Sequence, residues 1–205
     1  MKLSDIPEEI KKLDLIYNDR FTGPVYYHRL VKLLADVDFA GKKVLDAGCG
    51  YGLPSYVVRR GYGAAYVAGL NINPGQLEEA RKVFDRYQGD VVFINADMRA
   101  MPFADNSFDV VLATDVLEHI KDLGAALDEV SRVLKPGGVI AVSLPSENLL
   151  YDIGRNIFGG GRKPADHFWT AAQAEKVILS KFRPLKVSYA PFFFMPLYRL
   201  ILAEN

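Results

Sequence analysis

Short apolar runs, each bounded by glycine or polar turn residues, recur along the middle of the chain. They are apolar on consecutive positions and do not alternate with polar ones, which is typical of strands that are buried on both faces of a sheet. These runs cover residues 43–48, 65–70, 91–96, 108–114 and 138–144. The pattern therefore predicts five buried strands.

Apolar residues at helical spacing occupy the segments between these runs. They predict helices over residues 54–60, 74–87 and 120–134, preceded by N-terminal helices over 5–18 and 25–36. The tail predicts a helix near 170–181 and strands near 185–190 and 198–203. Strands that alternate with helices favour right-handed crossovers, so we expect an α/β protein with a doubly wound, Rossmann-like, mostly parallel sheet and helices on both faces.

Composition indicates which partners and which cellular compartment to expect. The 25 basic and 25 acidic residues cancel, so no overall field favours binding to nucleic acid. The lone Cys49 cannot form an internal disulfide, and acidic residues stand near the start where a signal peptide needs an apolar core. The longest apolar tract, residues 189–203, is interrupted by prolines and is too short to span a bilayer. We expect a cytoplasmic protein with no membrane insertion.

The segment VLDAGCGYG, residues 44–52, carries the first candidate chemistry. Gly48, Gly50 and Gly52 follow a buried strand and precede a helix, which lets a ligand approach the main chain closely. A dinucleotide fingerprint would place its third glycine where Leu53 stands, and the Asp46 carboxylate would repel a diphosphate. An adenosine that carries no phosphates and ends in a cationic amino acid suits this loop better than a dinucleotide does. The alternative is a glycine-rich loop without a ligand.

An ordered series of motifs extends this loop across residues 43–147. It runs VLDAGCGYG, GLNINPGQLEEAR, NADMRAMPFADNSFDVVLATDVLEHI and LDEVSRVLKPGGVIAVSLPSE. Together these segments resemble the class I S-adenosylmethionine-dependent methyltransferases, in particular those that act on small molecules. The resemblance implies a seven-stranded sheet whose last strand is antiparallel, with S-adenosylmethionine across the carboxyl ends of the first four strands.

The residue patterns divide the chain, and the resemblance assigns its cofactor residues. We expect one domain, residues 1–205, built from an N-terminal helical cap (1–40), a cofactor-binding core (43–145), a substrate lid (146–170) and a C-terminal helix with strands (171–205). The methionine part would meet the glycine loop, the adenine would meet the loop after the third strand, and the methyl donor would lie at the end of the fourth strand. The residues implied are Asp46, Gly48, Gly50, Gly52, Asp97, Met98, Thr114 and Asp115. The alternative for Asp97 is a helix or turn cap.

Asn71 departs from the family pattern, which places an acidic residue there to accept from both ribose hydroxyls. Asn can still accept and donate, but without the charge-assisted part of those bonds, so we expect a weaker ribose contact at this position. The run G-x-N-x-N is a variant associated with methyltransferases of sterols and other hydrophobic small molecules. The alternative is that Asn71 and Asn73 only form the turn before a helix that starts at Pro74.

Methyl transfer from a sulfonium requires alignment and, for some acceptors, a base. The candidate bases are His119, just after the fourth strand, and His167, in the lid; His28 in an N-terminal helix ranks below both. We predict no metal. The alternative is that Asp115, Glu118 and His119 share one face of an opening helical turn and bind a hard divalent ion.

The acceptor is expected to be a small hydrophobic or amphipathic molecule. Tyr17, Tyr27 and Trp169 could line its pocket, although aromatic residues at regular spacing are more often core residues. A nucleic-acid amino-methyltransferase would carry a Pro-Pro-aromatic motif where this chain reads ATDVLEH, and Cys49 is not where a cytosine C5 enzyme needs it. The alternative function, which Asn71 invites, is a catalytically weak or inactive subunit that binds S-adenosylmethionine and acts through a protein partner.

Overall fold

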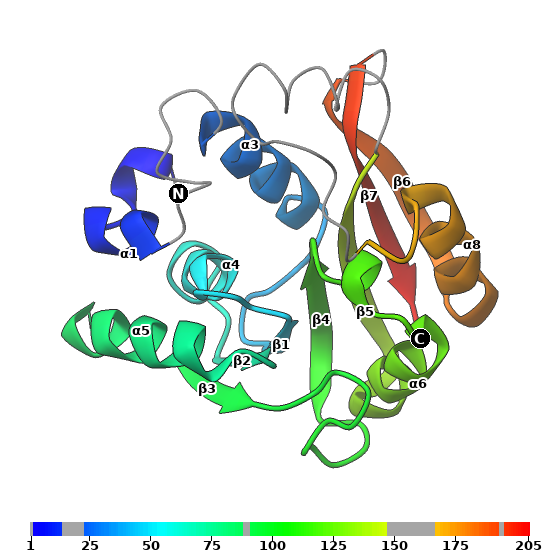
Figure 1. Ribbon diagram of the computed structural model, residues 1–205, viewed down its shortest axis with the longest axis horizontal. Helices are drawn as coiled ribbons and strands as arrows, with labels where there is room; N and C mark the ends of the chain where they lie inside the picture. The colour runs from blue at the N-terminus through cyan, green and yellow to red at the C-terminus, as the bar shows by residue number, and fades with distance from the viewer. Residues whose placement is uncertain (1, 14–22, 88–90, 147–166, 193–194) are drawn as a thin grey trace.

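The computed structural model is a three-layer sandwich with a seven-stranded sheet at its centre (Figure 1). It describes residues 2–13, 23–87, 91–146, 167–192 and 195–205. The strand order is β3-β2-β1-β4-β5-β7-β6. Strand bounds are β1 Lys43–Ala47, β2 Tyr66–Asn71, β3 Val91–Asn95, β4 Phe108–Thr114, β5 Leu134–Pro145, β6 Arg183–Phe192 and β7 Met195–Glu204.

The strand pairing confirms the predicted fold class. Strands β1 to β5 pair in parallel, and β7 runs antiparallel to both β5 and β6. The helices are α1 Glu8–Leu13, α3 Gly23–Leu34, α4 Leu53–Tyr56, α5 Pro74–Phe84, α6 Leu123–Val133 and α8 Ala171–Lys181. Among the described helices, none combines the length and the apolar character needed to cross a membrane.

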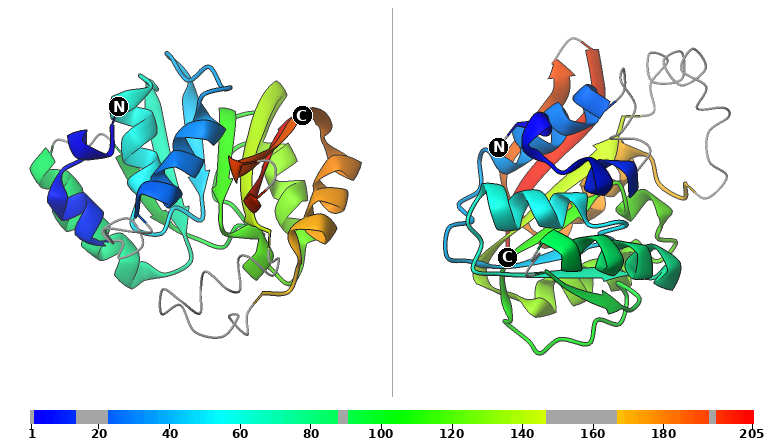
Figure 2. Two further views of the ribbon diagram at one scale, coloured as in Figure 1. Left: turned by 90° about the horizontal axis from the view of Figure 1, so that it is seen from above. Right: turned by 90° about the vertical axis from the view of Figure 1, so that its left-hand side faces the viewer.

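Two apolar cores separate the layers. One packs α1, α3, α4 and α5 against one face of the sheet through side chains such as Leu30, Leu53 and Leu77. The other packs α6 and α8 against the opposite face through side chains such as Leu127 and Ile178. Figure 2 shows these two helical layers on either side of the sheet. Because both faces are covered, the strands read as continuous apolar runs in the sequence.

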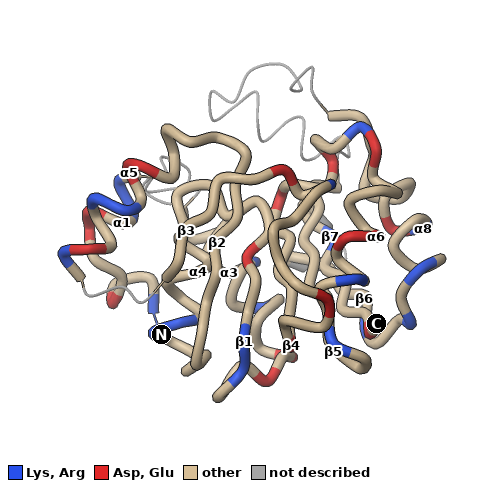
Figure 3. Tube along the Cα trace, turned by 90° about the horizontal axis from the view of Figure 1, so that it is seen from below, with Lys and Arg blue, Asp and Glu red and all other residues tan. Residues whose placement is uncertain are grey.

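Side-chain caps fix the starts of two helices, α5 and α6. Helix α5 begins at Pro74 and is capped by Asn73, whose side chain accepts from Gly75 N and Gln76 N. Helix α6 is capped by Asp122, which accepts from the Ala125 amide. Figure 3 shows Lys and Arg interspersed with Asp and Glu along the described trace. The division of the chain into cap, core and lid stays a prediction, and residues 147–166 of the lid lie outside the described residues.

Candidate functional site

A cavity of about 320 Å³ lies at the carboxyl ends of β1, β2 and β4. Doubly wound sheets bind their ligands at this edge, where strand order reverses. Five of the predicted site residues line it: Gly48, Asn71, Asp97, Met98 and His119. The structure therefore brings residues from three of the four motif segments to one cavity.

The glycine loop after β1 explains why glycine occupies its three positions. Gly48, Gly50 and Gly52 have φ values of 81°, 54° and 82°, a region that costs other residues free energy. A Cβ on Gly48 would lie 2.4 Å from Val116 Cγ2, and one on Gly52 would lie 2.8 Å from the Phe93 ring. A Cβ on Gly50 would meet nothing within 4 Å. Gly48 and Gly52 are required for close packing, whereas Gly50 is required only for its backbone angle.

Asp46 is buried at the end of β1 behind this loop. Its Oδ2 accepts a hydrogen bond of 2.6 Å from the Ser55 hydroxyl. Within the part of the chain that the structure describes, its Oδ1 has no hydrogen-bond partner. Burial raises the pKa of Asp46 to about 6, because the ionised carboxylate is poorly solvated there. A cationic group near this carboxylate would favour its ionised form.

The side chain of Asn71 is fixed by two hydrogen bonds at the end of β2. Its Nδ2 donates to Gln76 Oε1 over 2.7 Å, and its Oδ1 accepts from the Ile72 amide over 3.1 Å. Asn73, rather than Asn71, caps α5. The amide oxygen of Asn71 keeps a second lone pair with which to accept from a ligand hydroxyl.

Asp97 accepts hydrogen bonds within a local turn and also lines the cavity. Its Oδ1 accepts from the Arg99 backbone amide over 2.8 Å, and its Oδ2 accepts from Arg99 Nη2 over 2.6 Å. These hydrogen bonds from Arg99 hold the pKa of Asp97 below its usual range. The turn-capping role is present in the structure, and the adenine-binding role stays a prediction.

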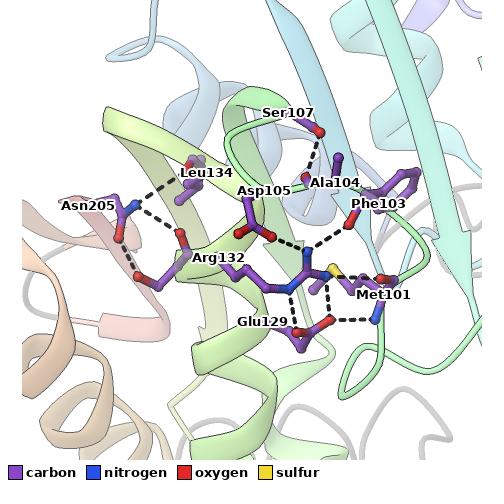
Figure 4. Close-up of polar contacts among 10 residues, drawn as sticks. Met101, Phe103, Ala104, Asp105, Ser107, Glu129, Arg132, Leu134 and Asn205 are labelled. Atoms are coloured by element: carbon purple, nitrogen blue, oxygen red, sulfur yellow. Dashed lines mark hydrogen bonds and ion pairs between the residues drawn. The ribbon is translucent and has the colours of Figure 1, made fainter.

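The loop after β3 that carries Asp97 is tied to α6 through Arg132 (Figure 4). Arg132 Nη1 donates to the Phe103 carbonyl over 2.7 Å and Nη2 donates to the Met101 carbonyl over 3.0 Å. Glu129 completes the network, because its Oε2 accepts from the Met101 amide over 2.7 Å. This cavity wall is therefore held by a charged pair on a helix and not by its own loop alone.

Thr114 closes β4 and Asp115 follows it with a φ of 52°. The Asp115 carboxylate accepts from Ser143 Oγ over 3.0 Å and forms an ion pair with Arg29. The alternative in which Asp115, Glu118 and His119 share one face of an opening helical turn is wrong. The local helix is a 3-10 turn, Leu117–His119, and α6 begins only at Leu123. The left-handed backbone at Asp115 turns its carboxylate toward Arg29 instead.

Arg29 is a residue that sequence reasoning missed. It is 2% exposed on α3, and its guanidinium lies 5.0 Å from the centre of the Tyr26 ring and 4.4 Å from that of Tyr198. The contact with Tyr198 joins α3 to β7, and the ion pair with Asp115 joins α3 to the end of β4. In the sequence, an arginine inside an amphipathic helix carries no signal for a partner so far along the chain.

His119 and His167 lie together although they come from separate segments. Their ring centroids are 4.6 Å apart at an angle of 83°. The Phe168 amide donates to the Glu118 carbonyl over 2.8 Å, and Trp169 Nε1 donates to the Ile120 carbonyl over 2.9 Å. These two bonds hold the segment of His167 beside that of His119, which lines the cavity. His28 is exposed on α3.

The three aromatic residues predicted to line the acceptor pocket do not share one location. Tyr17 lies outside the described residues. Tyr27 is 7% exposed in the core beneath α3, and burial raises its pKa to about 12. Trp169 packs against the core around α6 and α8.

The exposed apolar side chains on the cavity wall are instead Ile72 and Phe168, at 66% and 52% exposure. In the sequence, Ile72 follows Asn71 and Phe168 precedes Trp169. This adjacency to predicted site residues could have identified them.

Comparison with known proteins adds a family to this geometry. A family model described as a methyltransferase domain matches residues 45–142. Sterol 24-C-methyltransferase ERG6B of Gibberella zeae is 42% identical over 105 residues, which are 50% of this chain and 27% of that protein. The chain thus spans about a quarter of the length of this relative.

Solved structures show the same fold at low sequence identity. A protein from Pyrococcus horikoshii superposes with a TM-score of 0.76 and 22% identity over 92% of this chain and 93% of its own. The [4+2]-cyclase SpnF superposes with a TM-score of 0.70 and 22% identity over 87% of this chain and 80% of its own. A cyclase among the neighbours means that the fold alone does not decide the reaction.

Proposed function

Because the chain belongs to the class I S-adenosylmethionine-dependent methyltransferases, we propose that it transfers a methyl group from S-adenosylmethionine to a small hydrophobic or amphipathic acceptor. The observation that carries this proposal is the cavity at the carboxyl ends of β1, β2 and β4. Its walls combine the glycine backbone at Gly48 with side chains that can accept hydrogen bonds at Asn71 and Asp97.

The residues present fit the cofactor. Asp46 offers a buried carboxylate near the glycine loop, with Oδ1 lacking a hydrogen-bond partner among the described residues, to compensate the ammonium of the methionine part. Asn71 Oδ1 and the loop at Asp97 and Met98 would hold the ribose and the adenine. Gly48 lines the cavity, and its missing Cβ leaves room for the Val116 side chain, which lines the cavity beside it.

The sulfonium supplies an activated methyl carbon, so the protein needs mainly to align the acceptor and to exclude water. The cofactor would supply this methyl group to a nucleophilic atom of the acceptor, with the electrons of the C–S bond staying on sulfur and S-adenosylhomocysteine as the other product. His119 stands on the cavity wall, with His167 beside it, where either imidazole could take the proton that the acceptor loses.

Two features support an apolar acceptor. Ile72 and Phe168 expose apolar surface at the cavity, which suits a ligand that buries apolar area there. The curated relative with 42% identity over half of the chain acts on a sterol, as its name states.

Calorimetric titration with S-adenosylhomocysteine tests the cofactor site. We expect the wild type to bind one equivalent and Asp97→Ala to bind at least tenfold more weakly. The matched control is Asp38→Ala: Asp38 accepts from the Ala40 amide over 3.2 Å, the same local turn bond, before β1 at the opposite end of the sheet. Equal losses in the two variants, or no binding by the wild type, would refute the proposed cofactor site.

Turnover tests the reaction itself, because a protein of this fold can bind the cofactor without transferring its methyl group. Formation of S-adenosylhomocysteine from S-adenosylmethionine should be measured with a panel of amphipathic acceptors that includes a sterol. We expect stimulation by at least one apolar acceptor and none by polar amines. Tight cofactor binding without turnover on any acceptor of the panel would contradict the proposed acceptor class.

A further inference from the structure

Three metal-binding side chains converge beside the cavity. One ligand atom from each of Glu118, His119 and His167 lies within 4.8 Å of the other two. We propose that these residues bind one divalent transition-metal ion of the zinc or iron(II) type at the edge of the acceptor site. The proposal rests on the proposed function, because it assigns a role in that reaction to the same cavity.

The donor set selects the class of metal. Two imidazoles and one carboxylate suit Zn²⁺, Fe²⁺ or Co²⁺, whereas Mg²⁺ prefers oxygen ligands and keeps several waters. With metal–ligand bonds of about 2.1 Å, ligand atoms in a tetrahedral site lie about 3.4 Å apart. The observed spacing therefore requires the side chains to close by roughly 1 Å, which rotation of the imidazoles can supply.

The backbone already holds the two segments together without an ion. The Phe168 amide donates to the carbonyl of Glu118, the residue next to His119, over 2.8 Å. The indole of Trp169 donates to the Ile120 carbonyl over 2.9 Å on the other side of that histidine. Such support reduces the ordering cost of bringing His167 to the site.

This ligand set differs from the one that the sequence pattern allowed. Asp115 is committed to Arg29 and Ser143, and His167, from a distant segment, takes its place beside Glu118 and His119. Glu118 is only 2% exposed, and a divalent ion shared with two imidazoles would compensate the charge of this buried carboxylate.

The position of the ion gives it a role in transfer. His119 lines the cavity, so the ion's open coordination positions would face the acceptor. A hydroxyl bound there has a lower pKa and loses its proton to water before its oxygen attacks the methyl carbon. In that state the two imidazoles are ligands and are not available as bases, so the two roles exclude each other.

Titration of the tag-free protein with Co²⁺, followed by visible absorption and calorimetry, tests the site. We expect one Co²⁺ per chain, displaced by Zn²⁺ and not by Mg²⁺. His119→Ala, His167→Ala and Glu118→Gln should each weaken Co²⁺ binding at least tenfold. His28→Ala is the matched control, because His28 is the chain's remaining histidine and is exposed on α3.

The outcomes separate this proposal from the proposed function. S-adenosylhomocysteine binding measured in the presence of a chelator should survive in the Glu118 and His167 variants, which also shows that they fold. Absence of stoichiometric Co²⁺ binding by the wild type, or an equal loss in His28→Ala, would overturn the metal site and leave the histidines as bases. Co²⁺ binding without S-adenosylhomocysteine binding would refute the methyltransferase function instead.

Discussion

Asp46→Asn should remove a pH-dependent penalty on folding. In the folded protein burial raises the pKa of Asp46 to about 6, from its ordinary value of 3.8. The folded state therefore binds this proton more tightly than the unfolded state does. Its stabilising contribution is complete below pH 4, falls as the pH rises toward 6, and is lost above that value.

The size of the effect follows from the shift. A difference of about two pKa units corresponds to about 3 kcal/mol in the free energy of unfolding between pH 4 and pH 7.5. Asparagine can still accept from the Ser55 hydroxyl, but it buries an amide NH₂ at a cost of about 1 kcal/mol that does not vary with pH. The pH dependence of the difference between Asp46→Asn and the wild type is therefore the diagnostic quantity.

Urea unfolding of both proteins at several pH values between 4 and 8 measures this difference. We expect Asp46→Asn to gain about 3 kcal/mol relative to the wild type over that range, while its affinity for S-adenosylhomocysteine falls. Glu129→Gln is a control of opposite sign, because hydrogen bonds from Arg132 lower the pKa of Glu129. That variant should approach the wild type in stability as the pH falls. A constant difference between Asp46→Asn and the wild type would refute the reasoning.

Two further predictions concern the cavity wall. Gly50→Ala should cost about 1 kcal/mol in unfolding free energy for its left-handed backbone, whereas Gly48→Ala should cost about 3 kcal/mol because its Cβ also meets Val116. Val116→Ala should recover part of the Gly48→Ala loss, and equal costs at the two glycines in urea unfolding would contradict the packing argument. Asn71→Asp should tighten S-adenosylhomocysteine binding about fivefold by adding charge to its hydrogen bonds. Adding Gln76→Glu places a second carboxylate next to the carboxylate of residue 71 and should remove that gain in affinity, as measured by calorimetry. A gain in affinity that persists would show that Gln76 does not orient residue 71.

The sheet could be predicted from the sequence because its strands are buried on both faces and therefore continuously apolar. The start of β5 could not be predicted as well. The strand was expected over 138–144, but it spans Leu134–Pro145, because Leu134 pairs with Phe108 before an irregularity in the register. The expected helix over 120–134 begins instead at Leu123, where Asp122 supplies the cap. Its apolar spacing extends past the capped start, and periodicity alone does not mark that boundary.

The two sides of the site differ in what the sequence can reveal. Positions such as Gly48 are dictated by backbone angles and close packing within one motif, so their pattern is local. The ion pair between Arg29 and Asp115 joins residues 86 positions apart, and the contact between His119 and His167 joins separate segments through main-chain hydrogen bonds. Side chains of these types satisfy many roles, so their partners become evident only in three dimensions.

The carboxyl ends of β1 and β4 concentrate features that destabilise the ligand-free protein. Asp46 carries a charge in a buried position above pH 6, and Asp115 holds a left-handed backbone that costs a non-glycine residue about 1 kcal/mol or more. Arg29 and Ser143 hold Asp115 in place through contacts within the protein. The charge on Asp46 differs, because a cationic ligand can compensate it. Binding of such a ligand should therefore stabilise the protein more at pH 7.5 than at pH 5, where part of the Asp46 population is already neutral.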